Sequence, residues 1–206
     1  MDTKTTARLQ HTTQKTTGKG KTYDMAYIAV FTVLIAICSW ISIPTVVPFT
    51  LQTFAVFLAV SILGGKRGTM AVTLYVLLGA IGVPVFAEFS GGLGVILRNT
   101  GGYIIGFILS ALIMWLMESI FIKRLHAKHT LVVQAVSMVL GLLACYTAGT
   151  IWFMAVYMRE AGPIGLTTVL GWCVIPFIIP DIIKIALALI LGNTLRKPLG
   201  KIMNER

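Results

Sequence analysis

Six apolar segments, separated by short polar or glycine- and proline-rich gaps, most constrain how this chain can fold. Apolar residues make up 57% of the chain and charged residues only 12%, whereas a soluble domain is about a quarter charged. So few charges cannot cover a surface that faces water. The sequence therefore predicts an all-α integral membrane protein, a six-transmembrane-helix bundle. The segments run over residues 25–43, 50–63, 68–83, 100–122, 130–158 and 170–195.

Two of the segments are short, and one contains prolines. A helix needs about 20 residues to cross a bilayer, and segments 50–63 and 68–83 are shorter. We expect them to tilt, to end below the interface or to shelter beside longer neighbours. Pro176 and Pro180 predict an interruption in the last segment.

The ends of the chain differ from its middle. Residues 1–24 are rich in Thr, Lys and Gln, and such a composition buries too little apolar surface to fold by itself. We therefore expect a flexible basic tail over 1–24, a membrane domain over 25–197 and a short basic tail over 198–206.

The basic residues predict how the bundle is oriented. Fourteen of the 17 Lys and Arg residues lie in the two tails and in alternate connections, while the opposite connections hold Arg98 and Arg159. Because basic connections stay in the cytoplasm, both termini should be cytoplasmic and the number of crossings even. The net charge of +10 thus reflects membrane topology, and we expect a lipid bilayer but no nucleic acid as a partner.

The connections on the opposite side are predicted to face outward. Residues 44–49, 84–99 and 159–170 are rich in Gly, Pro and aromatic residues. Irregular backbone near membrane depth is tolerated where protein or a cavity satisfies it. These structured outward loops indicate a solute pocket, and the alternative is that they are simple connections.

Asp181 and Lys184 are the strongest candidates for chemistry. They interrupt an otherwise apolar run at i, i+3 spacing, so both face one side of a helix in the outer half of the membrane. Ionisable groups there are costly and usually face a partner or a cavity. The two residues either form a functional site or neutralise each other near the interface.

Other polar residues stand where helices are expected to begin. Asn99 or Thr100 can cap the fourth helix, and the N–H groups beside them can bind a carboxylate. Arg98 can extend to water or pair with an anionic ligand. Gln52 and Thr53 can bind a ligand or cap their own helix.

Catalytic and metal-binding motifs are missing from the sequence. There is no Gly-x-x-x-x-Gly-Lys-Ser/Thr loop for ATP hydrolysis, and no His-Glu-x-x-His. The three cysteines lack metal-ligand spacing. We expect no cofactor, no metal and no enzyme. A membrane-embedded enzyme with Asp181 and Lys184 as an acid–base pair is the alternative, although a second reactive group is not visible.

Several runs of residues, in order along the chain, resemble the BioY family, the biotin-specific S components of energy-coupling factor (ECF) transporters. The resemblance covers about residues 25–197. It rests on VPFTLQTFAV (47–56), GGKRG (64–68), YVLLGAIGVPVFA (75–87), FSGG (89–92), TGGYIIGF (100–107) and PDIIK (180–184).

The resemblance implies a high-affinity biotin-binding subunit in the cell membrane of a prokaryote. Such a subunit would capture biotin from outside and deliver it inward with a coupling membrane subunit and two ABC-type ATPase subunits. A solitary biotin carrier without ATPases is the alternative.

Matching donors and acceptors assigns roles to the candidate site. Asp181 would accept from the ureido N–H groups, and Asn99 and Lys184 would donate to the ureido carbonyl. Gln52 is a further polar candidate. The apolar wall would come from Phe49, Phe86, Phe89 and Tyr103, and the carboxylate would meet Arg98 or the loop at Ser90, Gly91 and Gly92.

Small residues on the first helix serve either packing within the bundle or docking of another membrane subunit, and their spacing does not separate the two. In lipid, small side chains allow close approach between helices, and the family resemblance implies that the coupling subunit docks on that face. The expected set is Ala26, Ala29, Thr32, Val33 and Ala36. Val33 stands where the usual Ala-x-x-x-Ala pattern has its second alanine.

Overall fold

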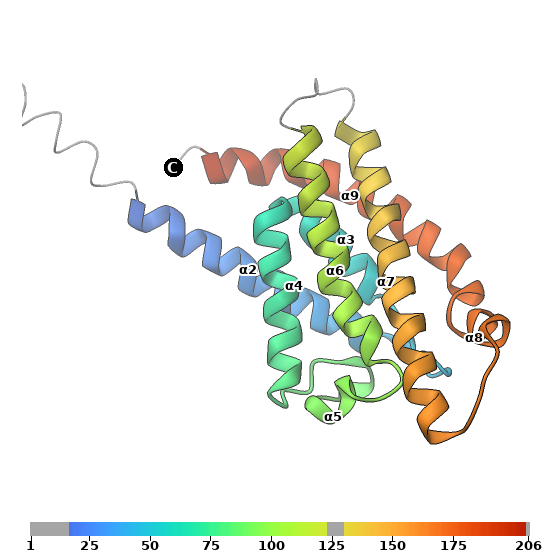
Figure 1. Cartoon of the computed structure of the whole chain (residues 1–206). Helices are drawn as coiled ribbons and strands as arrows, with labels where there is room; N and C mark the ends of the chain where they lie inside the picture. The colour runs from blue at the N-terminus through green and yellow to red at the C-terminus, as the bar shows by residue number, and fades with distance from the viewer. Residues whose placement is uncertain (1–16, 123–129, 205–206) are drawn as a thin grey trace, which may run out of the picture.

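The apolar segments form helices that pack side by side in a computed structural model, which describes residues 17–122 and 130–204 (Figure 1). The chain is mostly helical, as expected. The principal helices are α2 (Thr17–Trp40), α3 (Gln52–Leu63), α4 (Gly65–Ala80), α6 (Gly101–Met117), α7 (Thr130–Glu160) and α9 (Ile175–Asn204). Helix α6 continues into a π-helical turn, η2 (Glu118–Ile122).

Within the described residues, four helical stretches are long and apolar enough to cross a membrane: residues 22–40, 101–121, 130–160 and 166–196. The membrane fold predicted from composition is confirmed at this level. Helix α3 has only 12 residues, of which ten are buried. It is therefore sheltered by its neighbours, one of the arrangements expected for the short segments.

Short elements build the connections. Strands β1 (Ser42–Ile43) and β2 (Phe49–Thr50) pair antiparallel, with Ser42 opposite Thr50. The connection from α4 to α6 holds a 3₁₀ turn, η1 (Ala87–Phe89), and a one-turn helix, α5 (Leu93–Ile96); helix α8 (Leu166–Cys173) precedes α9. We call the end of the bundle formed by residues 41–51, 81–100 and 161–165 the loop end, and the opposite end, where α3 meets α4, the Gly64 end (Figure 1).

Helix boundaries differ from the prediction at both ends of the chain. Helix α2 begins at Thr17 and α9 extends to Asn204, so parts of both expected tails are helical. Adding residues to a formed helix is far easier than nucleating one, and Asp24 is held by an ion pair to Arg67 at 2.9 Å. The other tail residues lie outside the described part of the chain.

The predicted interruption at Pro176 and Pro180 is wrong. The break falls at Val174, between α8 and α9, and α9 runs through both prolines. Pro176 lies in the first turn, where a backbone N–H has no helical partner to lose. Helix α9 can therefore begin just before Pro176.

Glycines bring α6 and α7 into close contact. A methyl group at Gly106 would lie 2.9 Å from Cys145 Sγ, and one at Gly141 would lie 2.5 Å from Ser110 Oγ. Small residues allow such close packing of helices in lipid. This pair of helices forms one wall of the site described next.

Candidate functional site

A cavity of about 190 Å³ lies toward the loop end, between α3, α6, α7, α9 and the η1–α5 connection. Seven of the twelve predicted binding residues line it, and five do not. The seven are Gln52, Phe86, Ser90, Arg98, Tyr103, Asp181 and Lys184. Sequence reasoning therefore located the cavity but assigned its wall only in part.

Asp181 lies in the cavity wall and accepts three hydrogen bonds. Lys184 Nζ donates to Oδ1 at 2.7 Å, Thr53 Oγ1 donates to the same oxygen at 3.1 Å, and Tyr146 O–H donates to Oδ2 at 2.5 Å. The Asp181 and Lys184 side chains are 2% and 6% exposed. Helices α3, α7 and α9 thus meet at one buried carboxylate.

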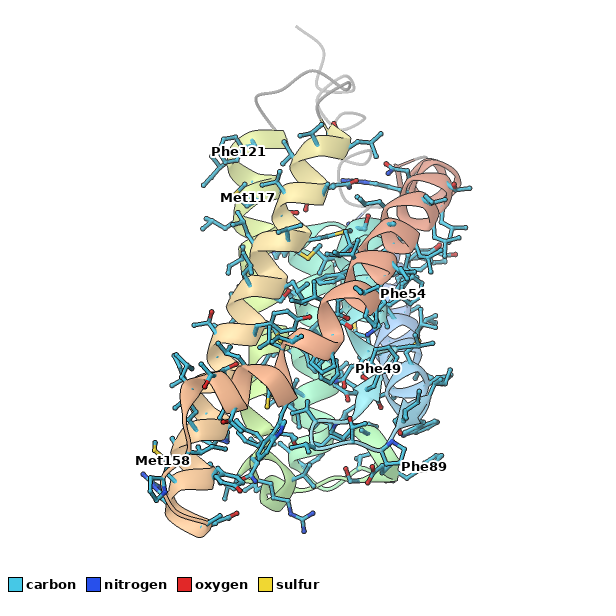
Figure 2. All side chains as sticks on the ribbon, turned by 90° about the vertical axis from the view of Figure 1, so that its right-hand side faces the viewer. Phe49, Phe54, Phe89, Met117, Phe121 and Met158 are labelled. Atoms are coloured by element: carbon cyan, nitrogen blue, oxygen red, sulfur yellow. The ribbon has the colours of Figure 1, made fainter. Side chains whose placement is uncertain are left out.

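Lys184 is fixed from three directions. Besides Asp181, its Nζ donates to Thr53 Oγ1 at 3.1 Å and lies 4.3 Å from the centre of the Phe49 ring. Phe49, on β2, also stacks on Phe177, with ring centres 5.9 Å apart. Figure 2 shows Phe49 nearer the middle of the bundle than Phe89. Phe49 therefore supports the ammonium group by a cation–π contact and does not itself line the cavity.

Asn99 and Arg98 occupy different positions at the start of α6. Arg98 lines the cavity and is exposed. Asn99 does not line it, but its Oδ1 is buried and has no hydrogen-bond partner within the described residues. Thr100 is the N-cap residue and makes no side-chain cap bond. A capping role does not account for Asn99.

The loop at Phe89, Ser90, Gly91 and Gly92 has a different arrangement from the one expected. Phe89 is 65% exposed and stacks on Trp40 with ring centres 4.9 Å apart, so it is not part of the apolar wall. The N–H groups of Ser90 and Gly92 already donate to Ala87 O at 3.2 Å and Gly79 O at 2.6 Å. They are not free for a carboxylate.

Gly91 does not line the cavity and lies close to the backbone of Val83. A methyl group there would lie 2.4 Å from Val83 O. Its role in the fold is therefore close backbone contact.

Tyr146, Cys145 and Cys173 line the cavity although sequence reasoning did not select them. Thr53 was noted only as a helix-start residue. The available signal was a tyrosine inside an apolar span, since a buried tyrosine hydroxyl usually has a hydrogen-bond partner. Spacing could not show which partner that is.

Known proteins identify the family. The sequence profile of the BioY family matches residues 7–201. The chain belongs to the BioY family. It is 41% identical to the biotin transporter BioY of Thermotoga maritima, over 82% of this chain and 92% of that protein. It is 36% identical to the probable biotin transporter BioY of Pyrococcus horikoshii, over 85% of this chain and 98% of that protein.

A solved structure agrees with this assignment. The crystal structure of the S-component for biotin from an ECF-type ABC transporter is similar with a TM-score of 0.75 and 27% identity, and the match covers 88% of this chain and 94% of that chain. The BioY family membership predicted from the sequence motifs is therefore confirmed.

The family also decides between transporter and enzyme. These relatives are named transporters, and the buried Asp181–Lys184 pair lines a cavity of a transporter fold. This chain is accordingly not an enzyme. Among residues 17–122 and 130–204, no group of three or more His, Cys, Asp or Glu side chains could hold a metal ion.

The predicted docking residues lie on two faces of α2. Ala26, Ala29 and Val33 are exposed on one face, whereas Thr32 and Ala36 are buried within the bundle. Thr32 Oγ1 donates to Ala71 O of α4 at 3.1 Å. Thr32 and Ala36 therefore pack α2 against its own bundle and are unavailable to a partner.

Proposed function

We propose that this protein is the high-affinity biotin-binding S component of an ECF transporter, and that biotin binds in the loop-end cavity. The buried Asp181–Lys184 pair in the cavity wall carries this proposal. Ionisable groups at membrane depth are retained where they serve a ligand or a pathway. Membership in the BioY family supports biotin as the ligand.

The hydrogen bonds of the network leave room for the ureido ring of biotin. A carboxylate offers about four acceptor positions, and Asp181 uses three. An ammonium group offers three N–H donors, and Lys184 uses two. One ureido N–H can therefore donate to Asp181, while Lys184 donates to the ureido carbonyl.

The rest of the cavity suits the other parts of biotin. Phe86, Tyr103 and Phe107 supply an apolar wall for the fused ring and its thioether. Arg98, also in the wall, would pair with the valerate carboxylate. Asn99, whose buried Oδ1 has no hydrogen-bond partner within the described residues, would be a further polar partner.

The distribution of charge supports the topology. We assign six crossings, both termini in the cytoplasm, and the loop end outside the cell membrane of a prokaryote. Fourteen of the 17 basic residues fall on the cytoplasmic side in this arrangement. Biotin would enter the cavity from outside.

The partners would be an ECF coupling subunit and two ABC-type ATPase subunits. The exposed face of Ala26, Ala29 and Val33 is the surface we assign to the coupling subunit. The test is biotin uptake into proteoliposomes with internal ATP. Uptake that requires the coupling and ATPase subunits supports this role, and equal uptake by the protein alone would establish the solitary carrier.

Biotin binding itself is tested on the protein purified in detergent. We expect saturable binding of radiolabelled biotin, with biotin recovered unchanged. Absence of binding, or chemical conversion of biotin, would contradict the proposal.

Removing the Tyr146 hydroxyl is expected to weaken biotin binding by at least about tenfold. Tyr146→Phe takes one donor from Asp181, and a hydrogen bond to a charged group contributes about 1.5–3 kcal/mol. Isothermal titration of biotin into the purified variant measures the change. Tyr157→Phe is the matched control, because Tyr157 lies on the same helix and its hydroxyl makes no hydrogen bond within the described residues. Unchanged or tighter binding by Tyr146→Phe would show that its hydroxyl does not support the site.

Trp40 holds the loop that carries Phe86, Glu88 and Ser90 into the cavity wall. It stacks on Phe89, and its Nε1 donates to Pro84 O at 3.0 Å. We expect Trp40→Ala to speed biotin dissociation about 30-fold, since the stack and the hydrogen bond together contribute about 2 kcal/mol. Dissociation of labelled biotin into excess unlabelled biotin measures this rate.

Trp40→Phe separates the two contacts of Trp40. It keeps an aromatic ring against Phe89 but lacks the N–H, so its dissociation rate should lie between wild type and Trp40→Ala. Equal rates for all three proteins would show that this loop does not retain biotin.

A further inference from the structure

The half of the bundle near the Gly64 end contains buried polar groups that the biotin cavity does not use. Ser61 on α3 and Gln134 on α7 are 3% and 6% exposed. Ser61 Oγ and Gln134 Oε1 have no hydrogen-bond partner within the described residues. Buried polar atoms without a partner are rare in folded proteins, and a bound water often accounts for them.

Both side chains line the same small cavity. Glu118 of η2 and Ser137 of α7 also line it, and its volume is about 10 Å³. One water molecule requires about 10–15 Å³ and about two to four polar partners. The cavity therefore matches a single water in size and in chemistry.

Helix α9, which packs against Ser61, offers the Ser61 hydroxyl no partner within the described residues. Helices α3 and α9 meet at the cavity through Thr53 and Lys184. Eight residues farther along each helix, Ser61 of α3 lies against Gly192 of α9. A methyl group at Gly192 would lie 2.3 Å from Ser61 Oγ. Gly192 has no side chain that could satisfy this hydroxyl.

We propose that one ordered water molecule is bound between α3, α7 and η2. The Ser61 hydroxyl donates to the water, and the water donates to Gln134 Oε1. Its second hydrogen is directed to the Glu118 carboxylate, which also lines the cavity. The water satisfies both unpaired atoms with one molecule.

A water fits this chemistry better than a cation. A cation accepts no hydrogen bond, so it would leave the Ser61 hydroxyl hydrogen unpaired. The charge of Glu118 is already balanced by Arg196 at 2.8 Å. Glu118 also accepts from the Gly65 N–H.

The water would extend an existing set of links between helices. Glu118 connects η2 to Arg196 on α9 and to Gly65 on α4. With the water, α3 and α7 join the same polar cluster. This polar cluster would thus hold the helices together at the Gly64 end, independently of the cavity at the loop end.

A crystal structure that resolves ordered waters tests the site directly. We expect one density peak within hydrogen-bond distance of Ser61 Oγ and Gln134 Oε1. An empty cavity would overturn the proposal. A thermal stability that rises in sodium chloride but not in choline chloride would overturn it in favour of a cation.

A double-mutant cycle tests the bridge in solution. Ser61→Ala and Gln134→Leu should each lower Tm by about 2–4 °C, and the double variant should lose less than the sum because the shared water is lost only once. Biotin affinity should be unchanged, so failure here is distinguishable from failure of the biotin proposal.

Ser119→Ala, which removes an exposed hydroxyl bonded to Leu116 O, is the control, and its loss in Tm should be additive with that of Gln134→Leu. Additive losses for Ser61→Ala and Gln134→Leu would overturn the bridge, and if either variant does not fold, the crystal structure decides.

Discussion

Replacing Asp181 by asparagine is expected to weaken biotin binding by at least about 100-fold. The carboxylate accepts from Lys184, Thr53 and Tyr146, and an amide of the same shape has no charge and only one acceptor oxygen. Breaking a buried ion pair costs about 3–5 kcal/mol. Titration of biotin into the purified variant measures the loss.

Two further variants separate binding from folding. Glu160→Gln makes the same chemical change at an exposed carboxylate on α7 and should leave the affinity unchanged. Asp181→Asn combined with Lys184→Met removes both charges, so it should fold even if Asp181→Asn alone does not. Wild-type affinity in either Asp181 variant would show that the pair only stabilises the bundle.

The ion pair was predictable from the sequence because membrane-buried charges are rare. Asp181 and Lys184 interrupt an apolar run at i, i+3 spacing, and helical geometry then places both on one face. Their network partners were not predictable in the same way. Tyr146 lies 35 residues away from Asp181 in the sequence, and no local pattern fixes how α7 is rotated against α9.

The loop residues were harder to place than the helical ones. Phe89 was expected in the apolar wall, yet Glu88 and Phe89 adopt φ values of 58° and 55°. This left-handed backbone is uncommon for residues other than glycine. The outcome is a Phe89 ring stacked on Trp40. Loops have no periodicity from which the direction of the Phe89 side chain could be predicted.

The docking face shows the limit of counting small residues. Ala26, Ala29 and Val33 follow three- and four-residue steps, and so do Thr32 and Ala36. Both sets fit a small-residue stripe. Only the packing of α2 shows that the second set contacts the bundle, as the hydrogen bond from Thr32 to Ala71 makes clear.

The turn from α3 to α4 brings these two helices into close contact. Gly64 adopts a φ of 79°, so the chain reverses sharply and α4 returns along α3. One turn into α4, a methyl group at Gly68 would lie 2.5 Å from the Val60 Cα and 2.9 Å from its nitrogen. Because these are backbone atoms, the two helices would have to separate.

Gly68→Ala is therefore expected to destabilise the protein by about 1–3 kcal/mol, although alanine favours helices over glycine by about 1 kcal/mol. The thermal unfolding of the purified variant measures this loss.

Gly171→Ala is the matched control, because Gly171 is also helical and a methyl group there meets nothing within 4 Å. It should be neutral or stabilising. If both variants unfold at the wild-type temperature, the close approach of α3 and α4 does not limit stability. Since α3 carries Thr53 to the Asp181–Lys184 pair, Gly68→Ala should also weaken biotin binding, whereas Gly171→Ala should not.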